Sequence, residues 1–238
     1  MDIIQIGETD KIKHFGEYLM SDVIKTVDNE DFNLEDFGDL FDALTDNVKG
    51  DIKSFESVVN LQGALNREIY LYGIEAGTGT SIEGYIRFWN EYDDTHNIPA
   101  DKRKPIKLYI DSNGGYLDDT FVIIDAIKMS KTPVWTICTG TAHSGGFFTF
   151  ISGHRRIAYP HSTYLFHEGV TGNSGTSGQF ENYSVFYKKQ LAQLKDITLE
   201  NTTITEEEYQ KIKRDDIWYF AEDGIKKGFI DEIATSFV

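Results

Sequence analysis

The stretch TGTAHSGGFFTFISG, residues 139–153, holds one serine, Ser144, in a setting that suits nucleophilic chemistry. The run VWTICTG before it is typical of a strand, and SGGFFTF is typical of the start of a helix. At a strand-to-helix turn the amide groups point outward, and the helix dipole favours negative charge. Gly145 also lets a carbonyl group approach its N–H closely. Ser144 is therefore a candidate nucleophile, and the simpler alternative is a small residue that fills a tight turn.

Chain order limits the possible partners of this serine, which needs a histidine to accept its proton and a carboxylate to orient that histidine. His14, His96 and His143 precede Ser144 in contexts that fit no chymotrypsin-like site. The subtilisin order fails because both partners would have to precede the serine. In the α/β-hydrolase order the acid would have to lie in the short span before His167, the last histidine. The order that remains is serine, histidine, acid.

Three histidines follow the serine. His154 and His161 lie in polar turns and are expected to be surface residues. His167 ends the apolar run STYLF, where a strand can project it from the edge of a sheet. A lone histidine at a strand end is more often structural, but its order and position favour His167 as the base. The glycines of DSNGG, residues 111–115, follow another strand and offer a second backbone donor to an oxyanion.

Four motifs, in this order, resemble those of the Clp protease proteolytic subunit (ClpP) family. In this chain they read LYIDSNGG, ICTGTAHSGGFF, YPHSTYLFHEG and RDDIWYFAEDGIKKGFIDEI. The usual family forms are close to LYINSPGG, ICxGxAASMGAF, LPNSRVMIHQP and RDxFMSAEEAxxYGLIDEV. The resemblance covers about residues 65–234 with similar spacing between motifs. Any one motif alone is weak, but four in order are specific.

The resemblance implies a role for individual residues. It matches Ser144 to the nucleophile, His167 to the general base and Asp216 to the orienting acid, with Asp215 as the competing acid because a one-residue shift would exchange the two. It assigns the oxyanion donors to the N–H groups of two glycines, Gly115 and Gly145. These roles imply a serine endopeptidase that hydrolyses unfolded or short polypeptides and needs no cofactor.

The order of elements and the resemblance agree on an α/β fold. From residue 67, short β-type runs alternate with helical ones, which predicts βαβ units and a largely parallel sheet. The resemblance implies a stack of β-β-α units of the ClpP/crotonase type with a protruding strand-helix handle. Residues 169–200 are expected to form the handle, a glycine-rich strand followed by a long helix. The strand would bind the extended substrate backbone through Gly169, Val170, Thr171 and Gly172.

Partners are also implied by the resemblance. Family members form heptameric rings that pair into a barrel, so a homo-oligomer with enclosed active sites is expected. A Clp-type ATPase unfoldase is the family's partner, and Tyr109 matches one aromatic position of its docking surface. Lys107 and Met129 occupy two further positions of that surface that are usually aromatic, which argues against this docking. Three further departures lie at the site, where a usual proline, a usual small residue and a usual methionine are replaced by Asn113, His143 and Gly145.

Composition adds further expectations. The chain has 238 residues and a formal net charge of -16, which opposes phosphate contacts with nucleic acid. No apolar run is long enough for a membrane helix, no secretory signal is visible, and a single cysteine excludes an internal disulfide, so a cytoplasmic location is expected. Residues 1–60 hold 15 Asp and Glu against 5 Lys and Arg, which predicts an acidic, partly helical extension before a ClpP-like domain at 61–238. Its helical face would carry six apolar residues: Phe32, Leu34, Phe37, Leu40, Phe41 and Leu44.

Three other functions remain open at this point. The acidic extension suits a pro-segment, a pore plug or a tether, as in virus-type prohead maturation proteases. A non-catalytic ClpP-like ring or scaffold subunit fits the altered residues around Ser144. A crotonase-fold acyl-CoA enzyme shares the fold but does not need the serine, histidine, acid order. A metal site is not expected, because DSNG begins like a calcium loop whose twelfth position is Val122 instead of glutamate.

Overall fold

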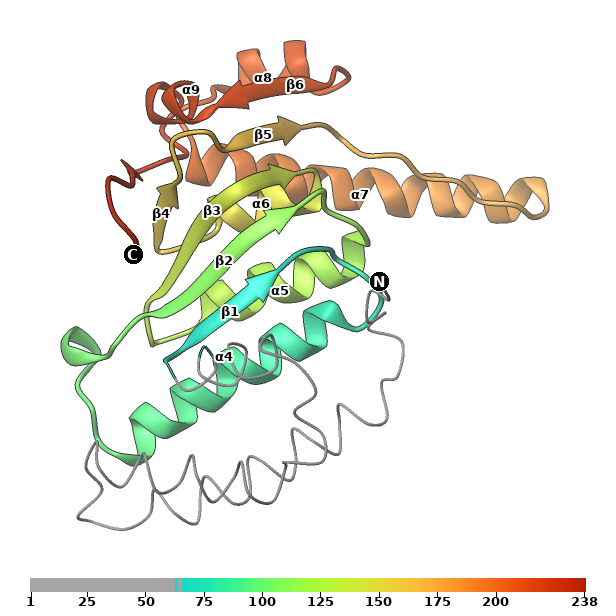
Figure 1. The fold of residues 1–238 in the computed structure, drawn as a ribbon. Helices are drawn as coiled ribbons and strands as arrows, with labels where there is room; N and C mark the ends of the chain where they lie inside the picture. The colour runs from blue at the N-terminus through green and yellow to red at the C-terminus, as the bar shows by residue number, and fades with distance from the viewer. Residues whose placement is uncertain (1–62, 64–65) are drawn as a thin grey trace, which may run out of the picture. The chain divides into compact units, whose positions relative to one another are not determined.

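A computed structural model describes Gly63 and residues 66–238. The acidic extension and its expected helix lie outside the described residues. Within that part of the chain, strands and helices alternate along most of the sequence (Figure 1). The strands are β1 (Glu68–Leu71), β2 (Ile106–Ser112), β3 (Val134–His143), β4 (Arg155–Ala158), β5 (Thr163–Phe166), β6 (Ile217–Phe220) and β7 (Glu232–Ile233).

The strands form one sheet that is mostly parallel, as the sequence predicts. Its main path runs β1-β2-β3-β4-β7, and every neighbouring pair on this path is parallel. The sheet forks along β3. Residues Trp135 to Cys138 pair with β4, whereas Thr141 to His143 pair with β5, and β5 then pairs with β6 in the antiparallel sense. The end of β3 therefore lies where the two branches separate.

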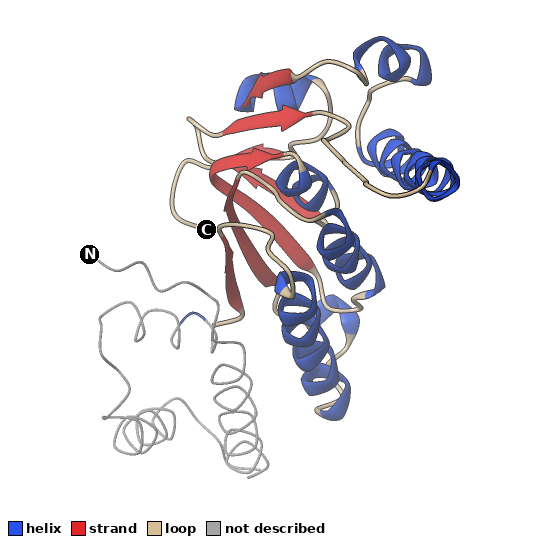
Figure 2. Ribbon diagram, turned by 90° about the vertical axis from the view of Figure 1, so that its right-hand side faces the viewer, coloured by secondary structure: helices blue, strands red, loops and turns tan. Residues whose placement is uncertain are grey.

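Helices gather on one face of this sheet (Figure 2). On β2, Leu108 and Ile110 are buried in the main core. Tyr109, which points to the opposite face, is buried in a second cluster with Ile137, Ile157 and Ala234. Helix α5 buries Ile123, Ile124 and Ile127 at the spacing of one helical face. The helices are α4 (Thr78–Thr95), the short 3₁₀ helix η1 (Ala100–Lys102), α5 (Leu117–Met129), α6 (Gly145–Ile151), α7 (Ser177–Asn201), α8 (Glu206–Ile212) and α9 (Ala221–Lys226).

Helix α6 is the best anchored of these elements, since all seven of its residues are buried. Phe147 meets Phe166 and Phe229 in edge-on contacts, with ring centroids 6.0 and 5.3 Å apart. Edge-on aromatic pairs contribute about 0.5–1.5 kcal/mol beyond their buried area. Because α6 starts directly after Ser144, this packing fixes the position of that serine.

Helix α7 and the stretch that leads into it project together beyond the sheet (Figure 1). A capping box starts the helix, since the Thr176 side chain accepts from the Gln179 N–H and the Gln179 side chain accepts from the Thr176 N–H. The long helix of the predicted handle is confirmed. The glycine-rich stretch before it forms no strand, because residues 167–176 have no pairing partner among the described residues and Gly169 has a φ of 83°.

Among the helices of the described residues, none has the length and apolar character needed to cross a bilayer.

Candidate functional site

Ser144 lies at the sharp turn between β3 and α6. Its φ of 54° and ψ of −122° are unusual for a residue with a side chain, and such backbone strain costs about 1–3 kcal/mol. Two hydrogen bonds hold the turn: the Ser144 N–H donates to the Leu165 carbonyl at 2.9 Å, and the Ser144 carbonyl accepts from the Phe147 N–H at 2.9 Å. A strained serine at a strand-to-helix turn presents its hydroxyl group outward, as nucleophilic serines do.

The loop after β2 brings two glycines against this turn. Gly114 has a φ of 88°, and a Cβ added to it would lie 2.7 Å from the Gly145 nitrogen and 2.9 Å from the Ser144 Cβ. At Gly115 an added Cβ would lie 2.0 Å from the carbonyl oxygen of Ile74. No other residue type allows the loop to approach so closely.

The N–H groups of Gly115 and Gly145 lie near each other. Two hydrogen bonds flank Gly115: Ile74 N–H donates to the Gly114 carbonyl at 3.0 Å, and Tyr116 N–H donates to the Ile74 carbonyl at 2.8 Å. In a parallel pairing this pattern leaves the Gly115 N–H on the side away from Ile74. The Gly115 nitrogen lies 3.5 Å from the position of a Cβ on Gly145, whose own N–H begins α6 and has no acceptor inside the helix.

His167 and Asp216 meet where β5 and β6 lie side by side. Nδ1 of His167 is 3.4 Å from Oδ1 of Asp216. The antiparallel register pairs Phe166 with Ile217, so one further step pairs His167 with Asp216. Nε2 of His167 is buried and has no hydrogen-bond partner among the described residues. A carboxylate near Nδ1 and an unpartnered Nε2 are the arrangement that the histidine of a catalytic triad requires.

The candidate nucleophile, base and oxyanion donors line one pocket of about 840 Å³. Ser144, His167, Gly115 and Gly145 all line it, and so does the whole stretch Gly169–Gly172. Asp216 stands behind His167 and is not part of the lining. Helix α7 makes a contribution that the sequence motifs do not indicate. It adds five residues to the lining: Tyr183, Phe186, Tyr187, Gln190 and Leu194. Their spacing at three and four residues on the predicted helix was the available sign of a shared face.

The two acids Asp118 and Asp119 also line the pocket, in the first turn of α5. Asp119 Oδ1 accepts from the N–H groups of Gly77 and Gly79 at 2.9 and 2.8 Å, which ties the start of α4 to α5. Asp118 Oδ1 accepts from Nε2 of Gln190 at 3.0 Å and so connects α5 with α7. Both carboxylates therefore hold the walls of the pocket together.

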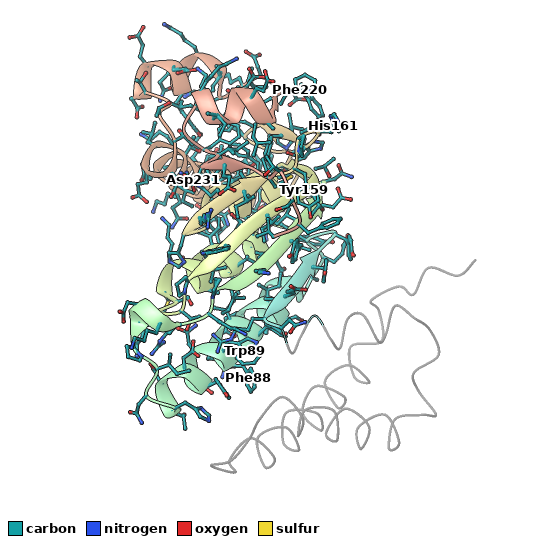
Figure 3. All side chains as sticks on the ribbon, turned by 60° about the vertical axis from the view of Figure 1, so that its left-hand side comes forward. Phe88, Trp89, Tyr159, His161, Phe220 and Asp231 are labelled. Carbon is teal, nitrogen blue, oxygen red and sulfur yellow. The ribbon has the colours of Figure 1, made fainter. Side chains whose placement is uncertain are left out.

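The other polar candidates lie elsewhere. His161 lies in an exposed turn (Figure 3), and His154 is exposed and accepts at Nδ1 from the Val134 N–H. Among the described residues the ion pair of His167 is with Asp216 and not with Asp215, whose N–H donates to the Ile212 carbonyl. Within the same part of the chain, no group of three or more His, Cys, Asp or Glu is arranged to hold a metal ion.

Comparison with known proteins identifies the family. The family model described as Clp protease matches residues 98–237, which is more than half of the chain. The chain belongs to the Clp protease family. It carries the mixed α/β fold and the mostly parallel sheet that the family resemblance implies.

Curated relatives agree with this assignment to the Clp protease family. The chain is 33% identical over 135 residues to "ATP-dependent Clp protease proteolytic subunit 2" of Treponema denticola, covering 56% of this chain and 68% of that protein. It is 34% identical over 141 residues to the protein of the same name in Prochlorococcus marinus strain MIT 9312, covering 57% and 68%. "ATP-dependent Clp protease proteolytic subunit 3" of Synechococcus sp. strain CC9902 is 32% identical over 141 residues, covering 57% and 69%. At these identities the chain is a divergent member.

One departure from the usual Clp protease motif has a visible structural reason. The family's usual methionine after the nucleophile is Gly145 here. An added Cβ at this position would lie 2.5 Å from Oγ1 of Thr120, and that hydroxyl donates to the Tyr116 carbonyl at 2.9 Å. The space beside Gly145 is therefore already filled by α5.

Proposed function

We propose that this chain is a serine endopeptidase with Ser144 as nucleophile, His167 as general base and Asp216 as orienting acid. The observation that carries the proposal is the setting of the His167 imidazole. Its Nδ1 lies 3.4 Å from Asp216, and its Nε2 is buried and has no hydrogen-bond partner among the described residues. His167 also lines the same pocket as Ser144. Membership of the Clp protease family and the strained turn at Ser144 support it.

In the proposed mechanism, Oγ of Ser144 attacks the carbonyl carbon of the scissile peptide bond as its proton passes to Nε2 of His167. Asp216 keeps the proton of the imidazole on Nδ1 and stabilises the imidazolium ion. The N–H groups of Gly115 and Gly145 donate to the oxyanion. The proton on Nε2 then passes to the leaving amine, and an acyl-enzyme forms. Water, deprotonated by His167, hydrolyses this ester and returns Ser144 to its starting state.

The proposed substrate is an extended polypeptide that lies along Gly169–Gly172. This stretch lines the pocket and has no strand partner among the described residues, so its backbone groups are available to a peptide. Tyr187 Oη donates to the Glu168 carbonyl at 3.0 Å and fixes the start of the stretch to α7. A homo-oligomeric ring, heptameric and paired, would enclose this site and admit only unfolded or short chains. A Clp-type ATPase partner and a cytoplasmic location stay predictions.

The test is the intact mass of the full chain after treatment with a serine-directed fluorophosphonate. We expect one adduct on the wild type and none on Ser144→Ala or His167→Ala, because only an activated serine reacts at a useful rate. An adduct that persists on Ser144→Ala would place the reactive serine elsewhere and overturn the assignment. No adduct on a folded wild type, before and after removal of residues 1–60, would favour a non-catalytic ring subunit.

A further inference from the structure

His143, the residue before Ser144, contacts three separate segments through its side chain. Its Nδ1 lies 3.1 Å from Oδ1 of Asn113, and its Nε2 lies 3.1 Å from Oγ1 of Thr163. The ring also meets Trp218 edge-on, with 5.1 Å between centroids and 84° between planes. One imidazole at the end of β3 thus connects the loop after β2, strand β5 and strand β6.

Each of these segments carries a group of the proposed mechanism. Asn113 is two residues before Gly115, whose N–H is a proposed oxyanion donor. Strand β5, which starts at Thr163, ends one residue before His167. Trp218 follows Asp216 by two residues on β6. The nucleophile turn is covalently attached to His143, so the imidazole contacts or adjoins all four parts of the site.

The neutral form of this ring satisfies both contacts. Oδ1 of Asn113 can only accept, so Nδ1 of His143 donates to it. In the neutral imidazole Nε2 is then an acceptor, and the hydroxyl of Thr163 donates to it. Burial lowers the pKa of His143, and the carboxylate of Asp111 acts against this more weakly. The neutral ring therefore makes both hydrogen bonds at once.

We propose that His143 is a positioning residue, which sets the oxyanion loop, β5 and β6 relative to the nucleophile turn. This inference rests on the proposed function, because the groups that it positions are those assigned there. A displacement of about 1 Å of a reacting group can cost about a hundredfold in rate. Loss of the imidazole is expected to slow the reaction of Ser144 in a chain that is still folded.

The test is a double-mutant cycle on the rate of fluorophosphonate adduct formation, followed by intact mass. We expect His143→Ala to react about tenfold or more slowly than wild type. Since Asn113→Ala removes one end of the same contact, the double variant is expected to react about as slowly as His143→Ala alone. His143→Gln, which keeps a donor and an acceptor, should recover part of the rate.

His154→Ala is the matched control. It removes a histidine whose Nδ1 accepts from the Val134 N–H at 2.9 Å, at the end of β3 away from Ser144. Its reaction rate should stay within about twofold of wild type. A wild-type rate for His143→Ala, or effects of His143→Ala and Asn113→Ala that simply multiply, would overturn the inference. If His143→Ala does not fold, Asn113→Ala takes its place, and a rate for that variant within about twofold of His154→Ala would overturn the inference.

Hydrogen–deuterium exchange separates this inference from the proposed function. In His143→Ala we expect faster exchange in peptides that contain Gly114–Gly115 and residues 163–167, with no such change in His154→Ala. If the wild type forms no adduct either before or after removal of residues 1–60, the proposed function fails, and the exchange data alone test the positioning role. Unchanged exchange in both peptides would then refute it.

Discussion

His167 and Asp216 face each other because the antiparallel register of β5 and β6 continues by one residue beyond Phe166 and Ile217. Their side chains meet at 3.4 Å, between Nδ1 and Oδ1. Successive residues on a strand point to opposite faces, so a shift of one position would turn the carboxylate away. The register therefore favours Asp216 over Asp215 as the acid that orients the histidine.

Asp216→Asn should slow the reaction of Ser144 with a fluorophosphonate by roughly 10²–10⁴-fold, because the amide holds the imidazole in the wrong tautomer and cannot stabilise its charge. The side chain of Asp216 is 65% exposed, so the thermal unfolding midpoint should change little. Asp215→Asn is the matched control, with the same chemical change one residue away, and should react at the wild-type rate. The opposite pattern, with a slow Asp215→Asn and a normal Asp216→Asn, would exchange the two roles.

The close packing of Gly145 against Thr120 gives a second prediction. In Gly145→Ala the new methyl group would lie 2.5 Å from Oγ1 of Thr120, so α6 or α5 must move. We expect a loss of about 1–3 kcal/mol in the free energy of unfolding and slower adduct formation at Ser144. Thr120→Ala in the same chain removes the clashing hydroxyl. It should restore part of the free energy of unfolding and part of the rate of adduct formation. Failure of the double variant to improve on Gly145→Ala would mean that the clash is not with Thr120.

The sequence predicts most elements of the sheet because their patterns are strong. Strand β2, Ile106–Ser112, belongs to the alternating runs predicted from residue 67, and helix α7, Ser177–Asn201, ends one residue beyond the handle expected at 169–200. Helix α8 was missed because its seven residues are mostly charged and bury only Tyr209. The strand expected before α7 was wrong for a different reason. A strand needs a neighbour to pair with, and a single sequence does not show whether one is present.

The candidate site likewise has residues that the sequence predicts and contacts that it does not. Chain order and the family motifs are sufficient to identify three candidate site residues from the sequence alone: Ser144, His167 and Asp216. The sequence does not reveal that His143 contacts Asn113 and Thr163, since these residues are 30 and 20 positions away from it. Contacts of this kind depend on the register of β3 with its neighbours, which the periodicity of a single strand leaves open.

A buried ion pair far from the site gives a third prediction. Arg67 contacts both carboxylate oxygens of Asp93, at 2.6 and 2.8 Å, and these side chains are 6% and 0% exposed. The guanidinium group also lies 4.4 Å from the ring centre of Trp89, at the opposite end of the domain from Phe220 of β6 (Figure 3). Arg67→Met leaves the Asp93 charge buried and unpaired, which should cost about 3–5 kcal/mol of unfolding free energy in a urea titration.

Arg87→Met is the control for this prediction. Its partner Glu83 is 3.0 Å away, but the two side chains are 61% and 37% exposed, and exposed pairs contribute little to stability. The urea midpoint of this variant should stay close to that of wild type. Equal midpoints for Arg67→Met and Arg87→Met would show that the buried pair does not stabilise the fold.

The single cysteine, Cys138, provides the last prediction. It also tests whether a labelling reagent could react with this thiol instead of Ser144. Burial raises the pKa of the Cys138 thiol to about 12, so at pH 8 only about one thiol in 10⁴ is ionised. Iodoacetamide should therefore leave the folded chain unmodified at pH 8 and add one group after unfolding in urea. Ser144→Cys is the positive control, because its new thiol would line the pocket and react while the chain is folded. Alkylation of the folded wild type would show that β3 opens enough to expose Cys138, and adducts assigned to Ser144 would then need to be located by peptide mapping.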